Sequence, residues 1–500
     1  MASQKKLKIL FVSAEVSPFA KTGGLADVAG SLPQALAVMG HDVRIAMPRY
    51  KFITHPTETR MDFPVLMGYR KETAIIREYY LDAFQGDVRK TVPVYFVDNY
   101  QYFDRDNLYC YYDECERFAF FCRAVIEMLP GLDFKPDIIH CNDWQTGPIP
   151  LLLKDIYGIL PFYRDIASVF TVHNLHYQGN YPRECLGLLG LAEDYYNQDK
   201  LEFYGNVSYL KAGLLYADII NTVSKTYARE IQTPDYGEGM DGLLRSRAGD
   251  LYGIVNGIHY HEFNPATDPN IARNYDEKSI EGKRENKRAV QQAMKLPERD
   301  VPVIGLISRL VDQKGLDLVA DSFAELMKYN IQIALLGSGD PYYEKFFTDM
   351  AQKYTDKTAA YIGFNARLAQ QIYAGADIFL MPSRFEPCGL GQLISLRYGT
   401  IPVVRATGGL ADTVTDYDEN TGNGNGFVFH EYSSEAFMKT VLRAISIYND
   451  RKDLWTRLVT SVMRMDFSWP ASAAEYVKLY RAAIEKRLLH TTTVEGISRK

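Results

Sequence analysis

The stretch from Arg384 to Gln392 places a carboxylate and two glycines directly after an expected buried strand at 378–381. A carboxylate can accept hydrogen bonds from neighbouring sugar hydroxyls, while the amides at a helix start can hold a phosphate. Charged side chains rarely lie at the end of a buried strand without a partner, so we expect Glu386 to act on a ligand. The backbone positions expected to bind beside it are Cys388, Gly389, Leu390 and Gly391.

Two cations follow the expected strand at 303–307, and their spacing suits an anionic ligand. Arg309 and Lys314 are five residues apart, which would let both reach a diphosphate at the end of that strand. A solvated pair of side chains at a helix start explains the spacing equally well. Gly337 ends the next expected strand, where a loop could bind a phosphate or a ribose, although such a sequence is more often a simple turn.

Lys21-Thr22-Gly23-Gly24 lies between the first expected strand, at 7–12, and an expected helix. Glycines let backbone amides approach an anion closely, and the lysine adds a full positive charge. The motif is neither a Walker A sequence nor G-x-G-x-x-G, so taken alone it is more typical of a plain turn.

Polar clusters end two further expected strands, at His140 to Trp144 and at Val172 to Asn174. A single His or Asp is more often a structural residue, but two such clusters at strand ends favour a site that contains Asp143, His173 and Asn174. No strand end carries an H-E-x-x-H or G-x-S-x-G motif, which argues against a metalloprotease or a serine hydrolase. We predict no metal ligand set and no cofactor.

The elements that must position these residues alternate as strand, helix and strand. Ser31 is expected to cap the first helix with Pro33 in its first turn, and a strand is expected at 42–47. Repeated βαβ units predict parallel sheets. Further strands are expected at 137–140, 168–172, 218–223, 331–336, 359–362 and 401–404, and helices at 315–329, 365–374, 390–398 and 471–489. The segment from 265 to 299 has no periodic pattern.

Two such series predict an α/β protein with two doubly wound, Rossmann-like domains that face a cleft. We expect the first domain at 1–262, the second at 263–470, and a C-terminal helix at 471–500 that crosses back to the first domain. One hexapeptide, Thr-Gly-Gly-Leu-Ala-Asp, occurs at 22–27 and again at 407–412. Either it is an economical strand-to-helix turn used twice, or both copies direct amide groups into the cleft.

The composition limits the partners and the compartment. Hydrophobic residues make up 47% and charged residues 24%, as in an ordinary globular protein, and the net charge of −6 argues against nucleic acid or an anionic membrane as a partner. The chain has no uninterrupted apolar run of about 18 residues and no signal-peptide pattern, so we expect a cytoplasmic protein. All six cysteines are expected to be reduced thiols, because none forms a C-x-x-C pair.

These motifs together resemble the bacterial glycogen synthase and starch synthase family of retaining glycosyltransferases, which have the two-domain GT-B fold. The resemblance runs from Lys8 to about residue 480 in the same order. The motifs that carry it are Lys21 to Val28, His140 to Trp144, Thr171 to Leu175, Asn256 to Ile258, Ser308 to Gly315, Pro382 to Leu390 and Thr407 to Leu410. Each is modest alone, and jointly they are specific.

The resemblance implies transfer of glucose from ADP-glucose to the non-reducing end of an α-1,4-glucan such as glycogen, starch or a maltooligosaccharide, with release of ADP. Lys21 with the Gly23 and Gly24 amides would meet the diphosphate and the transferred sugar. Arg309 and Lys314 would stabilise the negative charge that builds on the departing ADP, and such a cationic clamp needs no metal.

The resemblance also places the sugar and the acceptor. Glu386 would hold glucose hydroxyls, His173 would lie beside the anomeric carbon, and Asp143 would lie on the acceptor side. Asn256 would border the sugar site. The chain departs from the family pattern at Gly391, where a hydroxyl residue is common, and at His259, where Asp usually follows Asn-Gly-Ile.

Three other functions fit part of the pattern. UDP-glucose remains the alternative donor, because contacts with the base cannot be read from the sequence. A nicotinamide-dependent oxidoreductase would also have paired α/β domains, but G-x-G-x-x-G is absent after the first strand. A non-catalytic sugar-binding protein with hinged lobes would normally be exported, and no signal peptide is evident.

Overall fold

The structure is a computed structural model that describes residues 5–85 and 88–498. The chain forms two compact units. One comprises the chain up to Val223, Ala228–Ile254 and the chain from Trp469, and the other comprises Ser224–Tyr227 and Val255–Ser468. The domain boundaries predicted from sequence were 262/263 and 470/471, so the segment from 255 to 262 belongs with the second unit instead.

The first unit is built on a nine-stranded sheet in the order β12-β11-β7-β6-β1-β2-β5-β4-β3. All neighbours from β12 to β5 pair in parallel, and β3, β4 and β5 pair antiparallel. Its strands are β1 (Lys8–Val12), β2 (Asp42–Pro48), β3 (Glu58–Met67), β4 (Arg70–Gln85), β5 (Val88–Asp98), β6 (Ile138–Asn142), β7 (Ala167–Val172), β11 (Ile219–Thr222) and β12 (Leu251–Gly253). The predicted parallel strands are confirmed, and the antiparallel extension was not predicted.

A small three-stranded sheet and several helices complete the first half of the chain. The small sheet has the order β8-β10-β9, with β8 (Asn180–Tyr181), β9 (Glu202–Phe203) and β10 (Asn206–Ser208). The helices are α1 (Gly24–Val38), α2 (Tyr100–Phe103), α3 (Glu114–Gly131), α4 (Pro148–Leu151), α5 (Cys185–Leu189), α6 (Tyr209–Tyr216), α7 (Lys225–Glu230) and α8 (Asp241–Ser246).

Helix α1 begins earlier than predicted. Its N-cap is Gly23, and Ser31 and Pro33 lie inside the helix, so the predicted cap at Ser31 was wrong. The helix start is instead set by the turn at 21–24. Gly30 is required within α1, because a Cβ there would lie 2.5 Å from the carbonyl oxygen of Ser17. The loop after β1 therefore packs tightly against the helix that follows it.

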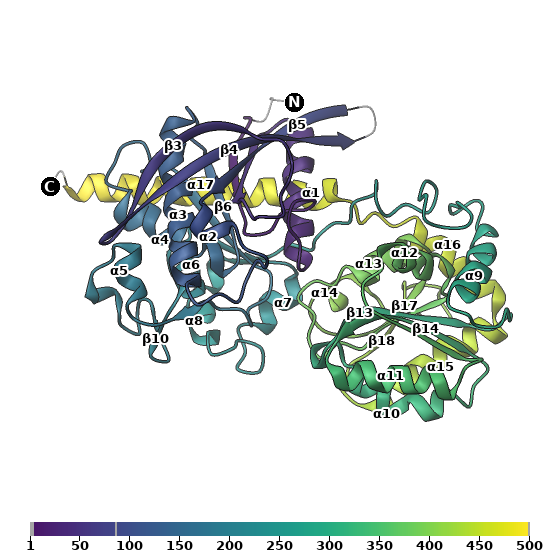
Figure 1. The fold of residues 1–500 in the computed structure, drawn as a ribbon. Coiled ribbons are helices and arrows are strands. Elements are labelled where there is room, and N and C mark those ends of the chain that lie inside the picture. The colour runs from purple at the N-terminus through teal and green to yellow at the C-terminus, as the bar shows by residue number, and fades with distance from the viewer. Residues whose placement is uncertain (1–4, 86–87, 499–500) are drawn as a thin grey trace. The chain divides into compact units, whose positions relative to one another are not determined.

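The last helix, α17 (Trp469–Ser498), drawn in yellow in Figure 1, belongs to the first unit and contacts β6, β7 and β11. Two tyrosines fix it there. The Tyr480 hydroxyl lies 2.8 Å from Nδ1 of His140 on β6, and the Tyr476 hydroxyl accepts from Asn221 Nδ2 on β11 at 3.1 Å. Buried polar groups must find partners, so these bonds fix the position of α17 along the strands.

The second unit is a six-stranded, wholly parallel sheet in the order β15-β14-β13-β16-β17-β18. A parallel sheet must be covered on both faces, and Figure 1 shows α10, α11 and α15 below this sheet and α9, α12 and α13 above it. The strands are β13 (Val303–Leu310), β14 (Gln332–Gly339), β15 (Thr358–Ile362), β16 (Ile378–Met381), β17 (Ile401–Arg405) and β18 (Phe427–Phe429).

The sequence predicted ranges for three of the helices in the second unit, which are α10, α12 and α13. The helices of this unit are α9 (Gly282–Ala293), α10 (Leu316–Leu326), α11 (Pro341–Lys353), α12 (Ala366–Gly375), α13 (Gly391–Arg397), α14 (Gly408–Thr413), α15 (Ser434–Asp450) and α16 (Lys452–Met463). Helix α9 lies in the segment from 265 to 299 that shows no apolar pattern. It is anchored by polar bonds: Lys283 Nζ donates to the Ala374 and Tyr398 carbonyls at 2.9 and 3.1 Å.

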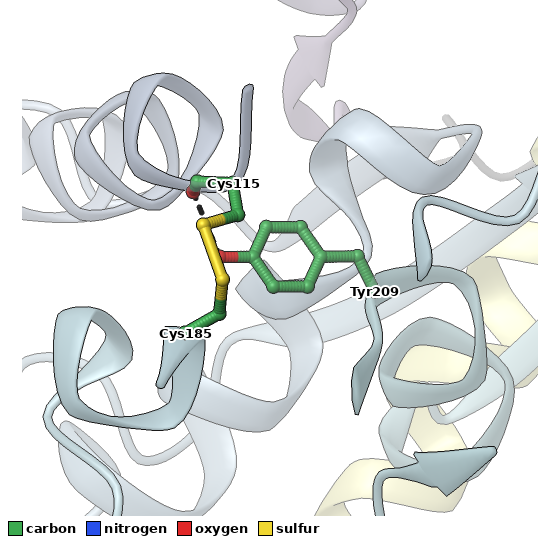
Figure 2. Close-up of a disulfide and its surroundings, with 3 residues drawn as sticks. All are labelled: Cys115, Cys185 and Tyr209. Atoms are coloured by element: carbon green, nitrogen blue, oxygen red, sulfur yellow. Dashed lines mark hydrogen bonds between the residues drawn. A yellow bond between two sulfur atoms is a disulfide. The ribbon is translucent and has the colours of Figure 1, made fainter. Parts of the chain in front are cut away.

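A disulfide joins Cys115 at the start of α3 to Cys185 at the start of α5, with their Cα atoms 6.2 Å apart (Figure 2). The Tyr209 hydroxyl donates to the Cys115 carbonyl at 2.8 Å beside this bond. The prediction of six reduced thiols was therefore wrong for this pair. The two cysteines are 70 residues apart in the chain, so no local spacing signals that they pair.

Across residues 5–85 and 88–498, no helix is both long enough and apolar enough to cross a membrane.

Candidate functional site

A pocket of about 200 Å³ lies at the carboxyl ends of β13 and β16 in the second unit. The predicted residues that line it are Arg309, Lys314, Glu386, Gly389, Leu390 and Gly391. They come from two segments, the end of β13 with the turn that follows it and the loop after β16. In parallel sheets this is the edge at which ligands bind.

Lys314 and Glu386 form an ion pair in this pocket. Nζ of Lys314 donates to Oε2 of Glu386 at 2.7 Å, and the Ser383 hydroxyl donates to the same oxygen at 3.0 Å. Glu386 is only 6% exposed. The carboxylate is thus held by two donors and keeps lone pairs for a further donor, as binding of a sugar hydroxyl requires.

The two loops that carry this pair are also joined through their backbones. The Arg384 amide donates to the Gln313 carbonyl at 2.9 Å, and Gln313 Nε2 donates to the Phe385 carbonyl at 3.3 Å. Gly315 has φ +67°, and a Cβ there would lie 2.0 Å from the Pro382 carbonyl oxygen. A glycine is required for this close approach.

Two more groups in the pocket are ready to meet a polar ligand. The Arg309 side chain lines the pocket from an exposed position at the end of β13. Beside it, Ser308 Oγ is buried and has no hydrogen-bond partner among the described residues. Buried hydroxyls normally have a partner, so the orphan marks a place that suits a bound polar group.

The backbone from Cys388 to Gly391 is positioned to bind through its amides. Those four N–H groups donate to no other residue in the part of the chain that the structure describes. Gly389 has φ +72°, which a glycine adopts without strain. The Asn256 amide donates to the Cys388 sulfur, and burial raises the pKa of that thiol to about 12, which makes it an inert packing group. Asn256 therefore lies beside this loop.

Gly337 has a packing explanation. It is buried in β14, and a Cβ there would lie 2.1 Å from the Ser308 carbonyl oxygen on β13. The close approach of the two strands accounts for the glycine. Gly337 is absent from the pocket lining, so a role in binding stays a prediction.

Asp143 and His173 meet at the carboxyl ends of β6 and β7 in the first unit. Oδ1 of Asp143 accepts the His173 amide at 2.7 Å, and His173 Nε2 lies 2.9 Å from Asn142 Oδ1. Burial raises the pKa of Asp143 to about 7 and lowers the pKa of His173 to about 3. A neutral imidazole is therefore held in one orientation, and the Asn174 amide also bonds to Asp143.

Lys21, Gly23 and Gly24 lie on an exposed turn at the start of α1. Lys21 Nζ lies 2.6 Å from Asp27 Oδ1, and the side chain remains 50% exposed. The amides of Gly23 and Gly24 donate to no other described residue, and a Cβ at Gly23 would have no atom within 4 Å. This turn can therefore accept an anion against its backbone.

The second copy of the hexapeptide is built differently. The Gly409 amide donates to the Glu386 and Pro387 carbonyls at 3.1 and 3.2 Å, and a Cβ there would lie 1.9 Å from the Cys388 carbonyl oxygen. These glycines let α14 approach the loop that carries Glu386. The Gly409 amide is thus used within the protein, and of the two explanations of the repeat, the strand-to-helix turn holds for the second copy.

Some residues of these clusters were not singled out from the sequence. Glu15 accepts from Thr22 beside Lys21, Asn142 contacts His173, and Ser383 donates to Glu386. A signal existed for Glu15, a charge that follows the apolar run of β1. No group of three or more His, Cys, Asp or Glu among the described residues has the arrangement of a metal site.

Comparison with known proteins identifies relatives over nearly the whole chain. Residues 8–246 match the family described as the starch synthase catalytic domain, and residues 288–457 match glycosyl transferases group 1. The chain is 60% identical to a glycogen synthase of Desulforudis audaxviator, over 96% of this chain and 97% of that one. It is 58% identical to a glycogen synthase of Moorella thermoacetica, over 97% and 98%.

Among solved structures, the chain is similar to the catalytic domain of starch synthase IV from Arabidopsis thaliana bound to ADP and acarbose. The TM-score is 0.87 at 34% identity, and the match covers 96% of this chain and all of that one. The predicted GT-B architecture is thereby confirmed.

Proposed function

The chain belongs to the family of glycogen synthases and starch synthases, and we propose that it transfers glucose from ADP-glucose to the non-reducing end of an α-1,4-glucan. The configuration at the anomeric carbon is retained and ADP is released. The observation that carries this proposal is the pocket where the ion pair of Lys314 and Glu386 lies beside Arg309.

Charge complementarity supports this reaction. As the bond between the anomeric carbon and the diphosphate breaks, positive charge builds on the sugar and negative charge on the ADP. We propose that Arg309 and Lys314 meet the diphosphate, and that the amides of Cys388 to Gly391 bind beside them. Preorganised cations and amides stabilise such charge more in the transition state than in the ground state.

The remaining predicted residues take the sugar and the acceptor. Glu386 accepts hydrogen bonds from the glucose hydroxyls, Asn256 borders the sugar, and Lys21 with the Gly23 and Gly24 amides meets the donor. His173, held neutral, lies beside the anomeric carbon, and Asp143 with Asn174 lies on the acceptor side. These assignments rest on motif and on the local geometry of each cluster.

Retention follows if the acceptor hydroxyl attacks from the face that the diphosphate leaves. The new bond joins the acceptor oxygen to the anomeric carbon, and the acceptor proton passes to the departing phosphate. No side chain is assigned as a nucleophile. Trapping a covalent glucosyl adduct of the native protein would overturn this pathway.

The decisive experiment compares donors. Purified protein is incubated with a glycogen primer and either ADP-glucose or UDP-glucose, and both nucleotide release and chain elongation are measured. We expect turnover with ADP-glucose and an α-linkage in the product. Faster turnover with UDP-glucose would reassign the donor, and no elongation with either would overturn the proposal.

We also propose the cytoplasm as the compartment. The supporting observation is the proposed donor, a nucleotide sugar of the kind made from nucleoside triphosphates inside cells. The disulfide between Cys115 and Cys185 departs from the usual state of cytosolic thiols, and its state in the cell is therefore a direct test.

A further inference from the structure

Glu15 is a buried carboxylate that lies just beyond β1 and is 4% exposed. Its side chain accepts three hydrogen bonds. Oε2 accepts the Thr22 amide at 2.5 Å, and Oε1 accepts the hydroxyls of Thr22 at 2.6 Å and Tyr109 at 2.7 Å. A buried carboxylate is stabilised only when donors surround it, and here all three donors come from loops rather than from the sheet.

The backbone that carries Glu15 is fixed independently of those loops. The Ser13 hydroxyl donates to the Glu15 carbonyl at 2.6 Å, and the Glu15 amide lies 3.3 Å from the same hydroxyl. The hydroxyl of Tyr50, which lies two residues beyond β2, donates to the Ala14 carbonyl at 3.0 Å. The backbone of Glu15 is therefore fixed without help from Thr22 or Tyr109. The carboxylate is the fixed group, and it positions the loops that donate to it.

Thr22 gives the carboxylate control over the turn at 21–24. Its amide and its hydroxyl both bond to Glu15, and two bonds from one residue fix orientation as well as position. The neighbours of Thr22 in the chain, Lys21 and Gly23, are both exposed to solvent. The contact between Glu15 and Thr22 therefore lies on the buried side of the turn whose exposed side carries Lys21 and Gly23.

Tyr109 connects the same carboxylate to a second loop, at 104–113, which precedes α3. That loop is anchored from below by Arg117, which is fully buried and donates through Nη1 to the Leu108 carbonyl at 3.1 Å. The Tyr109 hydroxyl is therefore a fixed donor. Glu15 joins the end of β1, the turn at 21–24 and the loop at 104–113 at one point.

We propose that Glu15 is a positioning residue for glucosyl transfer: it holds the turn at 21–24 in the geometry that presents Lys21 and the Gly23 amide to the donor, with Tyr109 fixing the shared oxygen. This inference rests on the proposed function. It adds a role for two residues, Glu15 and Tyr109, that do not touch the substrate.

Three variants differ in how many hydrogen bonds of the Glu15 carboxylate they keep. In Glu15→Gln, the remaining carbonyl oxygen can accept the Thr22 amide, and the new NH₂ faces two hydroxyls that can rotate to accept. Glu15→Ala leaves all three donors without a partner. Tyr109→Phe removes one donor and leaves the Thr22 contacts intact.

The first measurement needs no substrate. Hydrogen exchange at the Thr22 amide is expected to be slow in the native protein, faster in Glu15→Ala, and nearly native in Glu15→Gln and Tyr109→Phe. An unchanged rate in Glu15→Ala overturns the inference, whether or not the protein transfers glucose. If the native protein showed no transferase activity, the proposed function would be overturned, but the role of Glu15 in holding the turn at 21–24 would not.

The second measurement is steady-state kinetics with ADP-glucose and a glucan. Because a small misplacement of a positioned group can reduce the rate about 10²-fold, we expect kcat to fall by that order in Glu15→Ala, with little change in KM for the glucan. Glu15→Gln should recover most of the loss. The effects of Glu15→Gln and Tyr109→Phe should be non-additive, since they act on one contact.

Asp218 offers a matched control at the opposite edge of the sheet. It is buried, and its Oδ2 accepts both the amide and the hydroxyl of Ser168, at 2.8 and 3.0 Å, near the start of β7. We expect Asp218→Ala to lower the melting temperature as Glu15→Ala does and to leave kcat unchanged. Equal losses of kcat in both variants would show that general destabilisation explains the effect and would overturn the proposal.

Discussion

Nζ of Lys314 lies 2.7 Å from Oε2 of Glu386, and the two side chains are 18% and 8% exposed. The cation comes from the turn after β13 and the carboxylate from the loop after β16. Each charge is largely withdrawn from water, so each depends on the other for its compensation. The pair therefore orders the pocket before any ligand binds.

Removing one member of this pair should affect both activity and stability. We expect Lys314→Met or Glu386→Gln to lower kcat about 10²- to 10³-fold, since each removes a group proposed to act on the donor. Lys314→Met should also destabilise the protein by about 3 kcal/mol, because it leaves a buried charge unpaired. Kinetics and urea unfolding measure the two effects.

The double variant Lys314→Met/Glu386→Gln separates these effects. It should regain much of the lost stability and none of the activity. Arg384→Met is the matched control. Arg384 lies on the same loop as Glu386 and pairs with Asp317 at 3.1 Å, but its side chain is 52% exposed. The pair of Arg384 and Asp317 should contribute less than about 1 kcal/mol to stability, and Arg384→Met should leave kcat unchanged. Recovery of activity in the double variant would remove both residues from the clamp.

Replacing Arg309 should lower activity without lowering stability. Its side chain is exposed, so Arg309→Ala should leave the melting temperature unchanged and lower kcat about 10²-fold. Arg309→Lys keeps the charge but loses the planar fork that matches two phosphate oxygens, so it should recover activity only in part. Full activity in Arg309→Lys would show that a point charge is sufficient.

The parallel framework was predictable because its strands are short, mostly buried and mostly apolar runs. β1, β6, β7 and β16 are of this kind, and the polar residues that follow them mark the ligand edge. The antiparallel extension was missed because β3 is largely exposed and shows no continuous apolar run. Helix α9 was missed because polar bonds, such as those of Lys283, anchor it.

The contacts between side chains were the part that the sequence could not provide. Arg309 and Lys314 were predicted as a pair and Glu386 separately, but their convergence on one pocket depends on the turn after β13 and the loop after β16 meeting in space. Gly337 was assigned to binding because glycine at a strand end suits a phosphate, but the close approach of β13 gives a second reason for a glycine there. Spacing alone does not distinguish a glycine that admits a ligand from one that admits the protein's own backbone.

That distinction can be tested with the two copies of the hexapeptide. Gly23 has φ −158°, and a Cβ there would have no atom within 4 Å, so Gly23→Ala should fold with an unchanged melting temperature. It should raise KM for ADP-glucose, because the methyl group would stand where the donor approaches. An unchanged KM would show that the Gly23 amide is not used.

Gly409→Ala is the counterpart in the second copy. A Cβ there would lie 1.9 Å from the Cys388 carbonyl oxygen, so the loop that carries Glu386 must move. Overpacking of this kind should destabilise the protein by about 1–3 kcal/mol and lower kcat through displacement of Glu386. A native melting temperature for Gly409→Ala would contradict this tight packing of α14 against the loop.

The disulfide predicts a redox-dependent stability. Cys115 and Cys185 are 70 residues apart, and the segment between them contains β6, Asp143 and His173. In the chain-entropy account such a crosslink stabilises by about 4 kcal/mol, so reduction should lower the melting temperature of the native protein. The Cys115→Ser/Cys185→Ser variant should melt like the reduced protein and show no response to reductant. Acid-quenched thiol counting in cell extracts would then report whether the bond exists in the cell.

The buried carboxyl of Asp143 predicts a stability that falls as the pH rises. Its pKa is about 7 in the folded protein and near 4 when unfolded, so the folded state favours the protonated form. The stabilising contribution is complete below about pH 4 and is lost as the pH rises through 7, with a slope of at most about 1.4 kcal/mol per pH unit. Asp143 has φ +56° and ψ 178°, and Asn has nearly the same size and shape as Asp, so Asp143→Asn removes the charge and leaves the backbone requirement at this position unchanged.

The measurement is the free energy of unfolding of the native protein and of Asp143→Asn between pH 4 and 9. His173, whose pKa is lowered to about 3, contributes a loss of stability as the pH falls below 6.5, and this loss is common to both proteins. The difference between the two curves therefore isolates Asp143. We expect the variant to gain stability relative to the native protein from pH 4 to 7 and the difference to level off above pH 8. A difference that stays constant with pH would mean that the carboxyl is ionised throughout and is compensated by the amides of His173 and Asn174.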